Sequence, residues 1–227
     1  MVKRKPAAAG RFYPFDSSAL RSKIRNCFEH DLGPGNVPEE DVTSGFAGGI
    51  VPHAGLDYSG PCAAHVYERL VESGIPDVVV IFGTMHYSMS DFDADDRDYR
   101  TPLGTVKNVY DELDIDLEVD RTVHDREHSI EVQLPFLQYF SDDFKILPVG
   151  VSTTDDEKLR KLAKIIKDAL GDREAVFIAS TDFTHCGPRY GQPVPENMSP
   201  GKFVEEQDRK ALEMISHREA EGFIDVL

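Results

Sequence analysis

The sequence has few basic residues for its number of acidic ones. It contains 25 Lys and Arg against 41 Asp and Glu, which gives a formal net charge of −16. A nucleic-acid-binding protein needs a basic surface to displace the counterions of the phosphate backbone, so the composition argues against nucleic acid as a partner. The acidity fits a soluble protein, and it fits an acidic host proteome equally well.

Long apolar runs and cysteine are scarce as well. No apolar run is long enough to span a bilayer, so we expect no membrane partner. Residues 1–5 are basic, but residues 6–10 are not the apolar stretch of a signal peptide. The three cysteines, Cys27, Cys62 and Cys186, are odd in number and widely spaced, which indicates a reducing compartment rather than a disulfide framework. We therefore expect a cytoplasmic protein.

The apolar residues that are present predict an α/β domain. Four runs rich in Val and Ile lack alternation, which is typical of strands in a sheet covered on both faces. These runs are residues 46–51, 77–82, 144–149 and 175–180. Helical patterns fall among them, at residues 17–30, 61–73 and 154–170. Strands that alternate with helices predict one α/β domain over residues 1–227, a three-layer sandwich with a mainly parallel central sheet.

Local signals refine this expectation at three places. Thr154 and Glu157 fit a capping box at the start of the third helix. Residues 92–117 are expected to form a loop or ribbon insertion. Near the end, Ser216 and Glu219 fit another capping box, and the apolar face that follows stops in mid-pattern. We therefore expect a domain without its C-terminal segment, with apolar surface uncovered near Phe223 and Leu227.

Histidines follow three of the predicted strands. His53 comes after the first strand, His86 after the second and His185, with Asp182, after the last. In a parallel sheet, ligands gather beyond the carboxyl ends of the strands, and neighbouring strands lie about 4.8 Å apart. A single histidine after a strand is usually an ordinary loop residue, but three in equivalent places predict a shared metal site. Three imidazoles, with or without a carboxylate, suit Fe, Zn, Cu or Mn.

A second cluster lies at residues 127–131. If a helix begins near Glu127, then His128 and Glu131 share one face and could bind metal or transfer protons. The alternative is a solvated helix start whose acids complement the helix dipole. We assign His128 and Asp182 catalytic roles, with Asp182 as a ligand or a partner of one. Tyr58 and Glu127 are predicted substrate contacts.

A series of short motifs along the chain, each weak alone, is specific in its order. The motifs are residues 4–14, 52–55 with 58–60, 83–86, 101–104, 127–131 with 133–136, and 180–185. Together they resemble the Memo family, whose fold is similar to that of the LigB subunit of class III extradiol dioxygenases. The resemblance runs nearly from end to end and implies a LigB/Memo-like fold.

The resemblance also implies site residues. It implies a metal pocket with ligands at His53, His86 and His185 and with Asp182 beside them. The family's pocket includes a cysteine close to its C-terminus, which Cys186 does not match. The residue before His86 is Met, where many members have Ser.

The activity implied by the resemblance is less specific. Dioxygenase chemistry follows from the related fold, whereas the animal Memo protein is described both as a signalling effector that binds phosphotyrosine peptides and as a copper- or iron-binding redox protein. Iron or copper is therefore the expected metal, with zinc as a third option. Microbial relatives occur with a radical-SAM protein and an AMMECR-type protein, which indicates a modification pathway and possible partners. The sequence gives no oligomeric state.

Two functions remain open at this point. The first is a metal-dependent redox or dioxygenase-like enzyme that acts on a small or peptidic substrate in a His-lined crevice. The alternative is a non-catalytic effector module that binds a peptide or an anion in the same pocket. Histidines and acids suit a cation, whereas phosphate recognition needs Arg or a helix N-terminus. Arg11 and Arg126 are the nearby candidates for an anion, so the sequence favours the metal.

Overall fold

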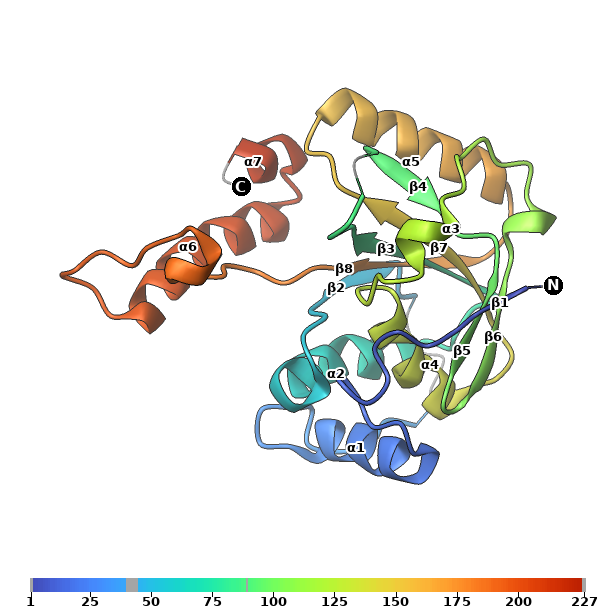
Figure 1. Ribbon diagram of the computed structural model, residues 1–227, viewed down its shortest axis with the longest axis horizontal. Coiled ribbons are helices and arrows are strands. Elements are labelled where there is room, and N and C mark those ends of the chain that lie inside the picture. Colours follow the sequence, from blue (N-terminus) through green and yellow to red (C-terminus); the bar gives the residue numbers. More distant parts are fainter. Residues whose placement is uncertain (1, 40–44, 89, 226–227) are drawn as a thin grey trace.

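A mixed sheet of eight strands forms the centre of the computed structural model, which describes residues 2–39, 45–88 and 90–225 (Figure 1). The strand order is β1-β5-β6-β7-β3-β8-β2, and β4 pairs with β7. Pairing is parallel except between β5 and β6 and between β4 and β7. The strands are β1 (Lys3–Arg4), β2 (Gly48–Val51), β3 (Val78–Thr84), β4 (Phe92–Ala94), β5 (Asp98–Thr101), β6 (Gly104–Asn108), β7 (Lys145–Val151) and β8 (Ala175–Ser180).

Helices cover both faces of this sheet. Figure 1 shows α1, α2 and α4 on one side of the strands and α5 on the other, while α6 extends away from the sheet. The α-helices are α1 (Ser17–Glu29), α2 (Leu56–Glu72), α3 (Arg121–His124), α4 (Leu134–Phe140), α5 (Asp156–Leu170), α6 (Pro200–His217) and α7 (Ala220–Asp225). The 3-10 turns are η1 (Tyr110–Glu112), η2 (Glu131–Gln133) and η3 (Pro188–Tyr190). The predicted three-layer α/β architecture is confirmed.

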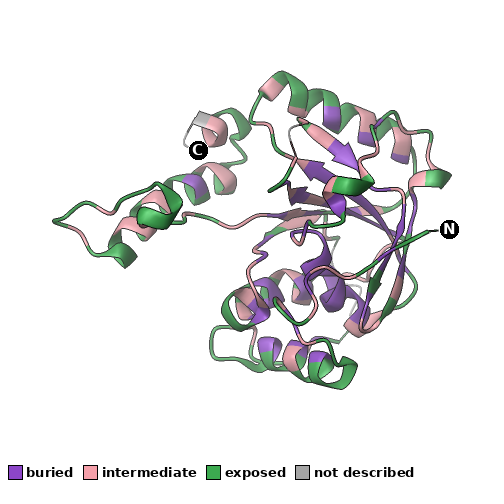
Figure 2. Cartoon of the chain, viewed as in Figure 1, coloured by how far each residue is buried: buried purple, intermediate pink, exposed green. Residues whose placement is uncertain are grey.

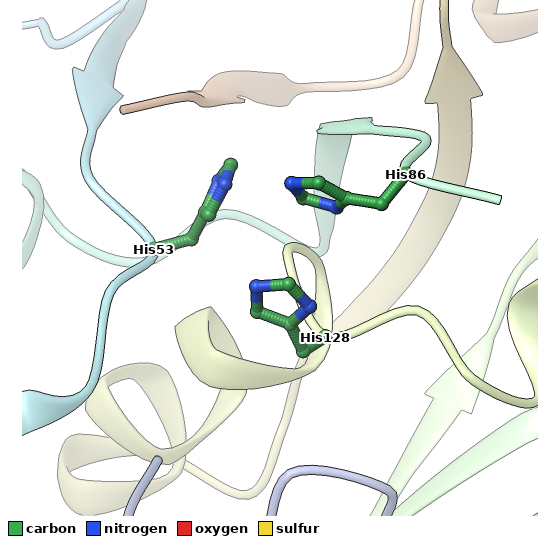
Figure 3. A group of neighbouring side chains, drawn as sticks. All are labelled: His53, His86 and His128. Carbon is green, nitrogen blue, oxygen red and sulfur yellow. The ribbon is translucent and has the colours of Figure 1, made fainter. Parts of the chain in front are cut away.

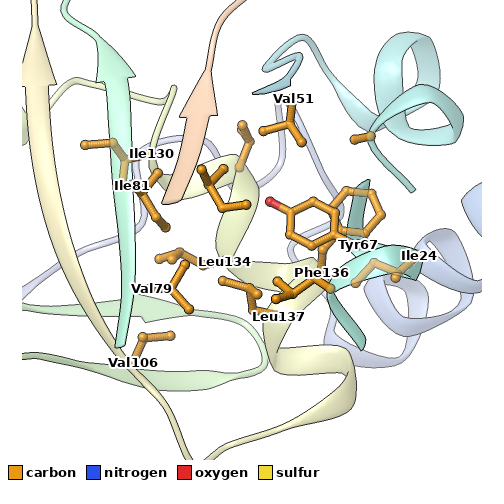
Figure 4. Packing of buried hydrophobic residues seen from close by; sticks show 14 of the residues in the cluster. Ile24, Val51, Tyr67, Val79, Ile81, Val106, Ile130, Leu134, Phe136 and Leu137 are labelled. Carbon is orange, nitrogen blue, oxygen red and sulfur yellow. The ribbon is translucent and has the colours of Figure 1, made fainter. Parts of the chain in front are cut away.

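The two apolar layers explain why the strand sequences do not alternate. Val79 and Ile81 of β3 pack into the cluster shared with α1, α2 and α4. Val78 and Val80 pack into the cluster beneath α5. Successive side chains of a strand point to opposite faces, so a strand covered on both sides needs apolar residues at every position. Figure 2 shows the buried residues concentrated along these strands, and Figure 4 shows the larger cluster.

Strands β2, β3, β7 and β8 lie at the four predicted runs. β8 matches its run residue for residue, while β3 and β7 each continue two residues further than expected. The predicted insertion at residues 92–117 contains β4, β5, β6 and η1, and β5 and β6 form an antiparallel ribbon. Strands β2, β8, β3 and β7 pair in parallel, so the segments that follow their carboxyl ends all leave the sheet at the same edge.

Three local predictions about helices need correction. The N-cap of α5 is Asp155, whose carboxylate accepts the amide of Lys158, so the box based on Thr154 is wrong. Ser216 lies inside α6, and its hydroxyl bonds to the carbonyl of Glu213, so the second box is wrong too. Helix α2 begins at Leu56, five residues before the predicted start at residue 61, and α6 was not predicted at all.

The C-terminal expectation is tested only in part. Phe223 is half-buried and lines a cavity of about 600 Å³ between α5, α7 and the ends of β3, β7 and β8. Leu227, the other residue of that prediction, lies outside the described residues. The expectation of an incomplete domain therefore stays a prediction. Among the described helices, none combines the length and the apolar character needed to cross a membrane.

Candidate metal centre

Three histidines from separate segments meet beyond the carboxyl ends of the central strands. His53 follows β2, His86 follows β3, and His128 lies in the turn that leads into η2. Each offers one ring nitrogen, and these nitrogens all lie within 4.8 Å of one another. The ring centroid of His128 lies 4.7 Å from that of His86 and 5.3 Å from that of His53 (Figure 3). Among the residues that the structure describes, this group could hold a metal ion.

The sheet register explains why His53 and His86 meet. Strand β8 lies between β2 and β3, and its last residue, Ser180, pairs with Val51 on one side and Gly83 on the other. Both histidines therefore leave the sheet at the same level, two and three residues after these paired positions. The predicted approach of His53 to His86 is what the structure shows.

Asp182 and His185 lie at the edge of the group rather than within it. The Oδ1 atom of Asp182 accepts the backbone amide of His53 at 2.7 Å. Its Oδ2 atom lies 3.8 Å from Nε2 of His53 and 3.7 Å from Nε2 of His185. The His185 side chain is 50% exposed, and its Nδ1 atom contacts the carbonyl of Phe183. The structure thus groups His128, not His185, with the other two histidines, and a ligand role for His185 stays a prediction.

Glu127 forms hydrogen bonds with two of the three histidines, His86 and His128. Its carboxylate accepts the backbone amide of His86 at 2.9 Å and lies 3.0 Å from Nδ1 of the same residue. It also accepts the backbone amides of His128 and Ser129. Only 1% of Glu127 is exposed. Its buried carboxylate therefore holds the backbone turns at His86 and His128 in place. The role of this residue as a substrate contact is not tested.

The environment of each ring alters its pKa. Burial lowers the pKa of His53, against the opposing charge of Asp182. Burial also lowers the pKa of His128 to about 4, outweighing the attraction of Glu127. The hydrogen bond to Glu127 raises the pKa of His86, with burial opposing it. At neutral pH the rings of His53 and His128 are therefore neutral and can offer lone pairs.

Glu127 itself stays ionised. Burial alone would raise its pKa, but the hydrogen bond from the His86 side chain and those from the amides of Ser129 and His86 outweigh that effect and hold the pKa well below its ordinary value. An ionised carboxylate behind a ligating imidazole is a common arrangement in metal sites, because it orients the ring and increases its basicity.

The N-terminal segment forms one wall of the site, which the sequence patterns did not predict. The ring of Phe12 lies 4.3 Å from that of His128, centroid to centroid. Glu131, predicted to share the chemistry of His128, is fully buried and instead holds this segment through the amides of Ala7 and Ala8. More than a hundred residues separate these groups in the chain, so no local periodicity could reveal the contact. The motif at residues 4–14 was the one available hint.

Tyr58, the second predicted substrate contact, lies in the first turn of α2, close in sequence to His53. Its side chain is largely free, with 87% of the residue exposed. The structure therefore leaves it available to a ligand but shows no contact that tests the prediction.

Comparison with known proteins gives a consistent result. A family model described as Memo-like protein matches residues 4–227. A MEMO1 family protein of Methanopyrus kandleri is 40% identical, over all of this chain and 80% of the relative. One from Methanothermobacter thermautotrophicus is 38% identical over 99% of this chain and 80% of the relative, and one from Saccharolobus islandicus is 36% identical over all of this chain and 81% of the relative. The chain belongs to the Memo-like protein family.

Proposed function

We propose that this protein binds a divalent transition metal at His53, His86 and His128 and uses it in oxidative chemistry on a small or peptidic substrate. The observation that carries the proposal is the approach of three ring nitrogens, from three separate segments, to within 4.8 Å of one another. Imidazole nitrogens suit iron, copper and zinc. Zinc has no redox chemistry, so an oxidative role favours iron or copper.

The surrounding charges support a cation over an anion. Two carboxylates lie close to the histidine rings: Glu127 bonds to Nδ1 of His86, and Asp182 lies 3.8 Å from Nε2 of His53. Negative charge near the ring nitrogens would offset the charge of a divalent ion and would repel a phosphate. The guanidinium of Arg11 lies over Phe12, whose ring contacts His128, and it could attract an anionic group of a substrate. That contact is the observation that favours the alternative, a pocket that binds a peptide or an anion without chemistry.

The protein's own residues have separate roles in this proposal. His53, His86 and His128 would hold the metal, which would supply Lewis-acid and redox chemistry to the site when bound. Glu127 orients His86 through its Nδ1 atom. Asp182 would accept a proton beside His53, and His185, half exposed and 3.7 Å from the same carboxylate oxygen, would pass that proton to solvent through a bridging water. His128, predicted as an acid–base group, is proposed as a ligand because of its place in the cluster.

Metal analysis of the protein purified without chelator or affinity tag tests the proposal. We expect a single bound transition-metal ion per chain, removable by chelator and restored by iron(II), copper or zinc salts. His65→Ala is a suitable control for alanine variants of the three cluster histidines, because His65 is exposed and contacts the carbonyl of Leu32, away from the cluster. Protein that contains no metal and takes up none would contradict the proposal. Bound metal without oxygen consumption toward any substrate offered would favour the binding module.

A further inference from the structure

A short chain of buried hydrogen bonds leads from the apolar core to the ring of His53. It begins at Tyr67, which is fully buried and packs among apolar side chains (Figure 4). The Tyr67 hydroxyl donates to Oε1 of Gln133 at 2.8 Å. Nε2 of Gln133 donates to the carbonyl of Pro52 at 3.0 Å and to the hydroxyl of Ser180 at 2.8 Å. Ser180 in turn lies 3.2 Å from Nδ1 of His53.

The direction of each bond follows from which groups can donate. The carbonyl of Pro52 can only accept, so the Gln133 atom facing it is the NH₂ group. That orientation directs the second N–H of the amide at the oxygen of Ser180. Tyr67 then supplies the donor that the amide oxygen requires. A buried amide held at both ends in this way has one orientation.

The proton of the Ser180 hydroxyl is also committed. Ser180 donates to the backbone carbonyl of Ser129 at 2.6 Å, and that carbonyl can only accept. A hydroxyl has one proton and two lone pairs. The Ser180 hydroxyl donates its proton to the Ser129 carbonyl and accepts a hydrogen bond from Gln133 with one lone pair. Only its second lone pair is left for His53. The Nδ1 atom of His53 must therefore be the donor.

We infer that Ser180 is a positioning residue that fixes the tautomer of His53. A neutral imidazole with its proton on Nδ1 has its lone pair on Nε2, the nitrogen near Asp182. Glu127 has the same effect on His86, because an ionised carboxylate accepts the Nδ1 proton. The protein thus holds the neutral ring of His53 in the form that can ligate a metal before any metal arrives, and it favours the same tautomer in the neutral form of His86. The tautomer of His53 matters for metal binding only if the proposed function is right, so the inference rests on that function, but the tautomer can be measured without any metal.

Nitrogen-15 NMR of the metal-free protein measures the tautomer directly. In protein labelled at histidine and held at mildly alkaline pH, long-range ¹H–¹⁵N correlations separate the Nδ1–H form from the Nε2–H form. His53→Asn identifies the His53 signals by their loss. We expect His53 in the Nδ1–H form. In Ser180→Ala the acceptor is gone, and we expect the signals to move toward the Nε2–H form, which unconstrained neutral histidine side chains favour.

Ser59→Ala is the matched control. The Ser59 hydroxyl bonds to the carbonyl of Ala54, the neighbour of His53, but does not contact the ring. We expect this variant to keep the wild-type tautomer. An Nε2–H form in the wild type overturns the inference even if Ser180→Ala does not fold, and so does an unchanged tautomer in Ser180→Ala.

A second readout separates this inference from the proposed function. Chelator competition should show about 10–100-fold weaker metal binding in Ser180→Ala, the effect typical of losing the partner of a ligating histidine, and little change in Ser59→Ala. If the wild type binds no metal, the proposed function fails while the NMR result still decides the tautomer. If Ser180→Ala changes the tautomer but binds metal as the wild type does, positioning by Ser180 is overturned and the metal site stands.

Discussion

At the scale of single residues, the site depends on side chains that never reach the surface. Glu127 and Ser180 are almost completely buried, and each faces the Nδ1 atom of one histidine. The two Nδ1 atoms therefore face partners of different charge, an ionised carboxylate for His86 and a neutral hydroxyl for His53. The hydrogen bond to Glu127 raises the pKa of His86, whereas burial lowers the pKa of His53.

Glu127→Gln tests the charged partner. The amide keeps the size of the carboxylate but loses its negative charge, so it orients His86 less firmly. We expect metal binding to weaken by about 10–100-fold, as is usual when the partner of a ligating histidine is changed. Chelator competition measures the effect. Unchanged affinity in a variant that unfolds like the wild type would show that Glu127 has only a structural role.

At the scale of elements, a close contact between α1 and α2 places the start of α2 beside the site. A Cβ atom at Gly60 of α2 would overlap the sulfur of Cys27 on α1. The thiol of Cys27 also lies 3.8 Å from the carbonyl of Leu56, the first residue of α2. Helix α2 follows His53 directly, so this contact helps to set where that loop leaves the sheet.

Gly60→Ala should therefore destabilise the protein although alanine is the better helix former. Overpacking of a core typically costs about 1–3 kcal/mol, which exceeds the gain of about 1 kcal/mol from helix propensity. In a Cys27→Ala background the space is free, and we expect Gly60→Ala to be neutral or stabilising. Urea unfolding of the two single variants and the double variant measures the coupling. Strict additivity would mean that the two residues do not touch.

The cysteines give an independent check of the same contact. Burial raises the pKa of Cys27 to about 11, so at pH 8 few molecules carry the reactive thiolate. Cys62 of α2 is exposed. In a Cys186→Ser background, which removes the partly buried third thiol, a disulfide reagent should modify Cys62 quickly in the folded protein and Cys27 only in denaturant, with Cys62→Ser removing the fast phase. Fast modification of Cys27 in the native state would contradict the packing of α1 on α2.

The elements that sequence predicts best are those whose pattern reflects burial. The apolar runs at residues 77–82 and 175–180 match β3 and β8 because both faces of these strands are covered. Helix α6 lacks such a pattern, since Ala211 is its one buried position among the described residues. Pro61 misplaced the start of α2, because proline usually marks a first helical turn but here lies inside the helix.

The site shows the same division. His53 and His86 could be paired from sequence because a regular sheet carries both to one edge. His128 could not be placed as a third member, because its position depends on the bond of the Glu127 carboxylate to His86 and on packing against Phe12, contacts between segments far apart in the chain. The position of His185 after a strand suggested a ligand; its half-exposed ring lies beside Asp182 and outside the group of three, and its ligand role stays a prediction.

At the scale of the whole molecule, the buried pair of Arg4 and Glu131 ties the N-terminus to the site. The Arg4 guanidinium bonds to Glu131, to the carbonyl of His124 at 2.7 Å and to the carbonyl of Glu127. It also lies 4.6 Å from the ring centroid of Tyr99 on β5. One side chain thus joins the edge of the sheet to the turn that carries His128.

Arg4→Met should lower the free energy of unfolding by about 3–5 kcal/mol, because it leaves the buried carboxylate of Glu131 without its cation. Adding Glu131→Gln should cost less than the two single changes together, since the unpaired charge is then removed. Lys23→Met is the control, because the pair of Lys23 with Asp57 is exposed and should contribute less than about 1 kcal/mol. Equal losses for Arg4→Met and Lys23→Met would contradict this view of the N-terminal segment.

The measurement that most directly tests the central claim is the metal affinity of His128→Ala beside that of His185→Ala. Both variants should keep the apo stability nearly unchanged, because a ligand in a polar crevice contributes little to the core. We predict that His128→Ala weakens metal binding as severely as His53→Ala and His86→Ala do, since it removes one of three converging nitrogens. His185→Ala should bind metal nearly as the wild type does. Loss of binding in His185→Ala, with binding retained in His128→Ala, would contradict the proposed ligand set.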